Sequence, residues 1–276
     1  MYPIVDVSAW DSADVGAPGQ RPKEWLVNPE TREYVLFKGA RYHASELAVE
    51  KVAAGLGIVT GIATAKTDLA VREGRKGVIS HRFMSVEETV IHGGDLLMGA
   101  RAQYDRARPR EQTFQLVREV LPPDLLPSMI EMVAFDALIG NTDRHHDNWA
   151  VIRSVSATDR LAPAYDHGSS LGSHVEDDHF DMPNLDAYIR RGRSAIRWSE
   201  DGAIFHLRHL ELLQRLVTEH EVEVLRALMK IFDAREEDLF AVIRDIPDNY
   251  AGAARRAFTE EILKRRLQLL REAFNG

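Results

Sequence analysis

The sequence predicts an α+β fold in which a strand-rich first lobe packs against a mainly helical second lobe. Two observations support this fold class. Short β-rich runs alternate with turn residues over the first hundred positions. From about residue 110 onward, apolar residues instead recur mostly three or four positions apart, which is the spacing of one helical face. The change falls near residues 84–89, so we assign residues 1–86 to the first lobe and 87–276 to the second.

The first lobe is expected to contain several strands and one helix. Residues 25–27, 34–38 and 77–83 are rich in β-branched and aromatic side chains, and we interpret them as strands of a twisted antiparallel sheet. Between the second and third of these runs, residues 44–56 carry apolar side chains at helical spacing. Gly57 is the expected end of that helix, because glycine is favoured just after a helix.

The second lobe is expected to be built around an apolar helix. Its stripe runs from Leu126 to Leu138, and Gly140 marks its end. Two short strand-like runs follow at residues 149–152 and 161–165. After Gly172 the pattern is mostly helical to the end of the chain, and the last helix carries apolar residues at Phe258, Ile262, Leu263, Leu267, Leu270 and Phe274.

Composition limits the classes of function. The chain has 276 residues, of which 45% are hydrophobic and 28% are charged, as in an ordinary folded, water-soluble protein. A net charge of −8 argues against direct nucleic-acid binding. Cysteine is absent, which excludes disulfides and thiolate chemistry and fits a reducing compartment. No apolar run approaches the ~20 residues of a membrane span, and the first residues lack a signal-peptide pattern. We therefore expect a cytoplasmic protein.

The densest group of chemically capable side chains lies between the apolar helix and the strand that follows it. Residues 140–148 read Gly-Asn-Thr-Asp-Arg-His-His-Asp-Asn. Phosphoryl transfer needs a carboxylate near the attacking hydroxyl and oxygen ligands for Mg²⁺. Asp143 and Asn148, five positions apart across a loop, provide such groups. Asp166 follows the strand at 161–165, and we expect the chain to bring it beside Asn148, so that both hold the metal.

A cation for the nucleotide phosphates is predicted in the first lobe. Lys38 ends an apolar strand, and its ammonium can neutralise the phosphates if a carboxylate holds it in place. Glu46 on the following helix is the candidate, and Glu50, one turn later, competes for the role. A strand lysine paired with a helix glutamate is a recurring part of kinase sites. The backbone of the connection that starts at Phe83 is expected to bind adenine.

These motifs resemble a known family. Residues 138–149, Leu-Ile-Gly-Asn-Thr-Asp-Arg-His-x-x-Asn-Trp, and residues 161–166, Leu-Ala-Pro-Ala-Tyr-Asp, resemble the C-terminal domain of HipA-like kinases. Shorter matches in the same order extend the resemblance over residues 15–272. It implies a two-lobed protein-kinase-like fold with ATP and Mg²⁺ as cofactors. Members of this family typically phosphorylate serine or threonine on proteins, often as toxins that a DNA-binding antitoxin restrains.

The resemblance also implies roles for individual residues. Asp143 would be the catalytic base, Asn148 and Asp166 would bind Mg²⁺, and Lys38 with Glu46 would anchor ATP. The chain contains no Gly-x-Gly-x-x-Gly loop. Four residues are instead our candidates for an irregular phosphate-binding loop: Gly16, Gly19, Gln20 and Lys23.

Three alternatives remain open from the sequence. The stretch from Asp143 to Asn148 also resembles the catalytic loop of phosphatidylinositol kinases, which favours a lipid or another small molecule as acceptor. A nucleotide-binding regulator that no longer transfers phosphate is a further alternative. The cluster His145, His146 and Asp147 offers transition-metal ligands, although adjacent histidines point in different directions, and we expect His145 to orient the loop through hydrogen bonds.

One basic run has no place in this site. Arg190, Arg191 and Arg193 follow each other closely in the helical part of the second lobe. Such a run is usually a solvated face. It is also a candidate docking site for the phosphate acceptor.

Overall fold

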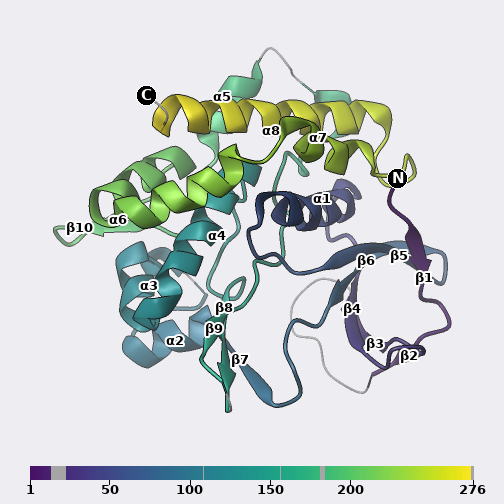
Figure 1. Cartoon of the computed structure of the whole chain (residues 1–276), viewed down its shortest axis with the longest axis horizontal. Coiled ribbons are helices and arrows are strands. Elements are labelled where there is room, and N and C mark those ends of the chain that lie inside the picture. The colour runs from purple at the N-terminus through teal and green to yellow at the C-terminus, as the bar shows by residue number, and fades with distance from the viewer. Residues whose placement is uncertain (14–22, 108, 156, 181–183, 275–276) are drawn as a thin grey trace.

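The computed structural model describes residues 1–13, 23–107, 109–155, 157–180 and 184–274. It has two packed parts, as Figure 1 shows: a curled sheet with the helix α1 (Ser45–Thr60), and a mainly helical part. The α+β fold predicted from the sequence is confirmed.

The first lobe is built on a six-stranded sheet with the strand order β1-β5-β6-β4-β3-β2. All neighbouring strands are antiparallel except the pair β1 and β5. The three predicted strands, at 25–27, 34–38 and 77–83, correspond to β3, β4 and β6 and pair antiparallel, as predicted. The parallel pair lies at one edge, where the long connection between β1 and β5 lets them run in the same direction. The strands are β1 (Ile4–Asp6), β2 (Asp11–Ser12), β3 (Lys23–Val27), β4 (Tyr34–Lys38), β5 (Thr67–Arg72) and β6 (Arg75–His81).

Helix α1 continues one turn past its predicted end. Gly57 lies inside the helix, where a Cβ atom would clash with the side chain of Thr64. The helix ends at Gly61, which has φ +69° and donates its N–H to the carbonyls of Gly57 and Ile58. Glycine is needed at position 57 for close packing and at position 61 for the left-handed cap. Sequence spacing does not distinguish these two uses.

Two hydrophobic clusters lie on opposite faces of the sheet. The smaller one contains Val35, Phe37 and Ile79. The larger one joins Leu69 and Val78 of the sheet to α1 and to the core of the second lobe. Helix α1 contacts β5 and β6 on one side and α7 (Glu236–Arg244) on the other. The two lobes therefore share one continuous core.

A three-stranded antiparallel sheet begins the second lobe, in the order β7 (Glu88–His92), β8 (Ala150–Ser154) and β9 (Arg160–Leu161). The predicted strand at 161–165 is shorter than expected, because Pro163 has no N–H for a ladder. Ala164 leaves this sheet and bridges Thr64 of the first lobe instead. β6 belongs to the six-stranded sheet and β7 to the three-stranded sheet. The lobe boundary at residue 86 lies between these two strands and remains a prediction.

The helices of the second lobe surround α4 (Leu126–Ile139), which packs against α6 and α8. Gly140 ends α4 with φ +68°, as predicted. The stretch after Gly172 is mostly helical, as predicted, and its described part also contains the short hairpin of β10 (Trp198–Glu200) and β11 (Ala203–Phe205). Among the described residues, no helix combines the length and apolar character that a membrane crossing requires. The remaining helices are α2 (Gly93–Ala100), α3 (Phe114–Val120), α5 (Leu185–Arg191), α6 (His209–Phe232) and α8 (Ala253–Phe274).

Candidate active site

The loop after α4 turns sharply because the Asn141 side chain forms hydrogen bonds to residues before and after it in the chain. The fully buried Asn141 side chain donates from Nδ2 to Asp136 Oδ1 at 3.0 Å and accepts the Asp143 N–H on Oδ1 at 3.0 Å. Such local side-chain hydrogen bonds fix a turn without regular secondary structure. The Asp143 side chain is half-buried at the end of this turn.

The buried Arg144 connects the three segments that form the site. Its guanidinium makes two parallel hydrogen bonds to Asp136 in α4, Nε to Oδ2 and Nη2 to Oδ1, both at 2.9 Å. Its Nη1 donates to the carbonyl of Asn148 at 2.6 Å and to that of Tyr165 at 2.7 Å. A buried ion pair is tolerated when its hydrogen bonds are satisfied in this way. The Arg144 side chain therefore holds both the loop and the segment before Asp166 against helix α4.

The predicted trio Asp143, Asn148 and Asp166 is brought together around this arginine. Asn148 Nδ2 donates to the Asp143 carbonyl at 2.7 Å, which closes the loop from residue 143 to residue 148 and directs Oδ1 away from that carbonyl. Asp166 directly follows Tyr165 and has φ +59°, a left-handed conformation that aspartate tolerates better than most residues. Backbone strain of this kind is concentrated at functional sites.

Lys38 reaches this trio from the first lobe. Its largely buried ammonium lies 3.9 Å from Asp166 Oδ1. Lys23 in β3 is the direct pairing partner of Lys38 in β4, so the two side chains project from the same face of the sheet. Two opposed lysines repel each other, and an anion between them relieves this repulsion. Gln20, Gly16 and Gly19, the other candidates for the phosphate loop, lie outside the described residues.

The two candidate glutamates of α1 have different surroundings. The Glu46 carboxylate accepts the N–H groups of residues 41–43 at 3.0 to 3.2 Å, which ties the connection between β4 and α1 to the helix. Glu50 is 3% exposed, and its Oε2 accepts the His167 N–H at 3.1 Å. Glu50 therefore joins α1 to the residue beside Asp166. A Lys38–Glu46 pair remains a prediction, and Glu50 is the glutamate that contacts the backbone beside Asp166.

Phe83 lies beside the same segment. Its ring stacks on Tyr165 with centroids 5.7 Å apart, and it packs on a small apolar cluster that includes Ala150, Ile152 and Ala162. The Phe83 carbonyl accepts a hydrogen bond from Arg160 at 3.0 Å. An adenine contact at Phe83 remains a prediction, in which the N–H or the second lone pair of this carbonyl would take part.

The histidines of the loop stabilise its turn. The Asp147 N–H donates to His145 Nδ1 at 3.1 Å, which is the kind of contact predicted for His145. The buried His146 hydrogen-bonds through Nδ1 to the Tyr104 hydroxyl at 3.0 Å. His145, His146 and Asp147 each place a potential ligand atom within 4.8 Å of the others. The Asp147 carboxylate, however, is ion-paired with Arg106, a cation that would oppose a bound metal.

Two buried histidines, His167 and His209, contact the residues that hold the loop in place. His167 packs edge-on against Phe135, and its Nδ1 lies 3.3 Å from Arg144 Nη2. His209 Nε2 donates to the Asn141 carbonyl at 2.7 Å. Burial lowers the pKa of each histidine to about 3, because a charged imidazole would lose its hydration. Both rings are therefore neutral at physiological pH.

These low pKa values predict loss of stability in acid. In the unfolded chain a histidine pKa is about 6.5, so below that pH the unfolded state binds more protons. Each buried histidine then lowers the free energy of unfolding by about 2 kcal/mol between pH 6.5 and pH 5. His209→Gln keeps a donor for the Asn141 carbonyl and should reduce this loss by about that amount. Urea unfolding of wild type and His209→Gln at pH 6.5 and pH 5 measures this change in the free energy of unfolding. Substitution of the exposed His179 by glutamine is the control. An unchanged pH dependence in His209→Gln would contradict the assignment.

Several supporting residues were not predicted from the sequence. Asp136 and Arg144 form the central ion pair, and Gln112 Nε2 donates to the Arg144 carbonyl at 2.8 Å. A charged residue inside an apolar helical stripe is a signal that singles out Asp136. Gln112 and His209 lie far from the loop in sequence, and nothing in their local pattern indicates these contacts.

Comparisons with known proteins identify the family and the fold of the chain. The family model for the HipA-like C-terminal domain matches residues 15–234. The crystal structure of the Helicobacter pylori proinflammatory kinase CtkA is similar with a TM-score of 0.81 and 18% identity, covering 98% of this chain and 97% of that chain. A chain in the solved complex of the Shewanella oneidensis MR-1 toxin–antitoxin proteins HipA and HipB with operator DNA has a TM-score of 0.63 and 15% identity, covering 100% of this chain and 70% of that chain. At these identities the likeness establishes a shared fold. Curated protein sequences give no match.

Proposed function

Because the chain belongs to the HipA-like C-terminal domain family, we propose that it is an ATP- and Mg²⁺-dependent kinase that phosphorylates serine or threonine on a protein. The observation that carries this proposal is the meeting of Asp143, Asn148 and Asp166 around Arg144, with Lys38 3.9 Å from Asp166. This set contains a base, hard oxygen ligands and a cation, which are the groups that phosphoryl transfer requires.

Each group has a role in the proposed reaction. Lys38 and Lys23 face the phosphates of a nucleotide held between the lobes. The Asn148 amide oxygen and the Asp166 carboxylate fit Mg²⁺, which prefers hard oxygen ligands and, when bound, neutralises charge on the transferred phosphoryl group. Asp143 orients the acceptor hydroxyl and takes its proton. Glu50 positions the Asp166 segment through the His167 N–H.

Substitution of Asp166 tests the metal part of this proposal. Asp166→Asn keeps the side-chain size and tolerates the left-handed backbone, but it removes the charge. We expect Mg²⁺-dependent binding of a non-hydrolysable ATP analogue to weaken by about tenfold or more, because even indirect metal partners contribute 10–100-fold. Calorimetry with and without Mg²⁺ measures this difference. Asp159→Asn, which removes a carboxylate paired with the exposed Arg153, is the matched control. Equal Mg²⁺ dependence in wild type and Asp166→Asn would disprove the ligand assignment.

The acceptor class is tested by incubating the protein with γ-labelled ATP, Mg²⁺ and a cell extract. We expect label on serine or threonine of a protein. Label that partitions into an organic solvent would replace this proposal with a lipid kinase. Label on a small soluble compound would indicate a metabolite kinase, and tight ATP binding with no transfer would indicate a regulator.

A partner protein is also part of the proposal. The HipA neighbour was solved with HipB and operator DNA, and by analogy we propose that a small DNA-binding protein restrains this chain in the cytoplasm. With a net charge of −8, contact with DNA would be made by that partner rather than by this chain. Co-purification of a helix-turn-helix protein encoded beside it would support this, and purification alone from its native host would oppose it.

A further inference from the structure

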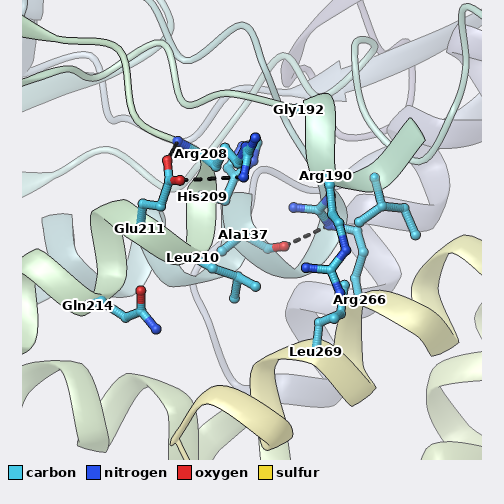
Figure 2. Close-up of a pocket in the computed structure, with 11 residues that line it drawn as sticks. Ala137, Arg190, Gly192, Arg208, His209, Leu210, Glu211, Gln214, Arg266 and Leu269 are labelled. Carbon is cyan, nitrogen blue, oxygen red and sulfur yellow. Dashed lines mark hydrogen bonds and ion pairs between the residues drawn. The ribbon is translucent and has the colours of Figure 1, made fainter. Parts of the chain in front are cut away.

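A cavity of about 220 Å³ lies among α4, α5, α6 and α8, outside the proposed nucleotide site. Figure 2 shows its lining, which includes Ala137, Arg190, His209, Glu211 and Arg266. None of the predicted catalytic or metal-binding residues lines it. Its volume is below the ~300–1,000 Å³ of pockets for drug-sized ligands. It therefore suits a small molecule better than a nucleotide.

Arg266 is the central feature of this cavity. It projects from α8, is only 7% exposed, and donates from Nε to the Ala137 carbonyl at 2.7 Å. Within the described part of the chain, no carboxylate forms an ion pair with it. Burial without such a partner lowers the pKa of Arg266 to about 10. A buried guanidinium is costly unless an anion accompanies it, so the cavity beside it is suited to a negative charge.

Two further positive groups line the same cavity. Arg190, on the last turn of α5, contributes a second guanidinium, and Figure 2 shows it at the cavity together with Arg266. The first turn of α6 starts at His209 and also lines the cavity, and a helix N-terminus carries partial positive charge. The nearby Glu211 carboxylate accepts the Arg208 N–H at 2.7 Å and pairs with its guanidinium, so its charge is compensated.

We propose that this cavity binds a small phosphate-bearing anion, which contacts Arg266 and Arg190 in front of the first turn of α6. Planar guanidinium groups match the geometry of phosphate oxygens, and helix N-termini favour the same ligand. Three positive groups from separate helices line the same cavity. Arg190 is itself exposed, and in this proposal the part of it that lines the cavity contacts the bound anion.

The position of this cavity relates it to the catalytic loop. Arg266 holds the Ala137 carbonyl in the last turn of α4, and a Cβ at Gly140 would lie 2.9 Å from the Arg266 guanidinium carbon. His209 holds the Asn141 carbonyl. An anion in the cavity therefore contacts the side chains that position the start of the loop carrying Asp143. The binding proposal itself does not depend on kinase activity.

The experiment is calorimetric titration with inorganic phosphate at low ionic strength, on wild type, Arg190→Gln and Arg191→Gln. Arg191 is exposed and adjacent but does not line the cavity, so it matches the change in charge. We expect Arg190→Gln to weaken phosphate binding by about tenfold or more, because a charge-assisted hydrogen bond is lost. Arg191→Gln should bind as wild type does. Equal affinity in the two variants, or no binding by wild type at tens of millimolar phosphate, would overturn the proposal.

Two more variants locate the bound phosphate. Lys38→Met removes a cation of the nucleotide site and should leave phosphate binding unchanged. Arg266→Met should abolish it, with circular dichroism confirming that the variant is folded. Loss of binding in Lys38→Met but not in Arg190→Gln would assign the anion to the nucleotide site and overturn the proposal. If no phosphate is transferred from γ-labelled ATP, the kinase proposal is wrong, but the expected phosphate binding in the cavity is unchanged. The two proposals can therefore be disproved independently.

Discussion

Replacing Asp143 with alanine is expected to lower phosphate transfer from ATP by about 10²–10⁴-fold, the usual contribution of a positioned general base. The fold should survive, because the loop is held by the backbone of residue 143. Its N–H donates to Asn141 and its carbonyl accepts from Asn148, and alanine keeps both hydrogen bonds. Transfer of label from ATP to protein measures the activity, and thermal unfolding confirms the fold.

The matched control for this experiment is Asp147→Asn in the same loop. The Asp147 carboxylate pairs with the exposed Arg106, away from the contacts that join Asp143 to Asn148. We expect Asp147→Asn to keep activity within a few-fold of wild type. Wild-type transfer by Asp143→Ala would exclude it as the base. Loss of activity in Asp147→Asn with retention in Asp143→Ala would instead support the transition-metal site at His145, His146 and Asp147.

The largest effect on stability is expected from Arg144→Met. This change leaves the Asp136 carboxylate buried without its cation, and removal of one partner from a buried ion pair costs about 3–5 kcal/mol. The carbonyls of Asn148 and Tyr165 also lose their donor. Urea unfolding at neutral pH measures the loss. Activity should fall as well, since Asn148 and Asp166 lose the side chain that holds their segments together.

A double-mutant cycle separates the ion pair from simple loss of packing. Asp136→Leu with Arg144→Met removes both charges, so the double variant should be less destabilised than the sum of the two single variants. Arg153→Met, which breaks an exposed pair with Asp159, is the control and should change the free energy of unfolding by less than about 1 kcal/mol. Additive effects of Asp136→Leu and Arg144→Met would show that the pair is not coupled as described.

The errors of the sequence-based prediction have a common physical origin. Gly57 was assigned as a helix end, but it makes room for the Thr64 side chain. The strand expected at 161–165 ends before Pro163, which has no N–H for the ladder, and Ala164 then pairs with the first lobe. Each error concerns a contact between segments that are apart in the chain, and local propensity cannot report on such contacts.

Local patterns in the sequence are enough to predict most helices and strands of this protein and to select its candidate reactive groups. Apolar periodicity is a local property, so it predicts α4 and its end at Gly140. Asp143 and Asn148 are five residues apart, so one loop holds both whatever surrounds it. The contacts that hold these groups in place follow only from the tertiary structure. Three contacts depend on how helices and lobes pack: the hydrogen bond between Glu50 and His167, the hydrogen bond from Gln112 to Arg144, and the shared cavity of Arg190 and Arg266. Packing between distant segments produces no hydrophobic period and no motif in the sequence, so it cannot be predicted from either.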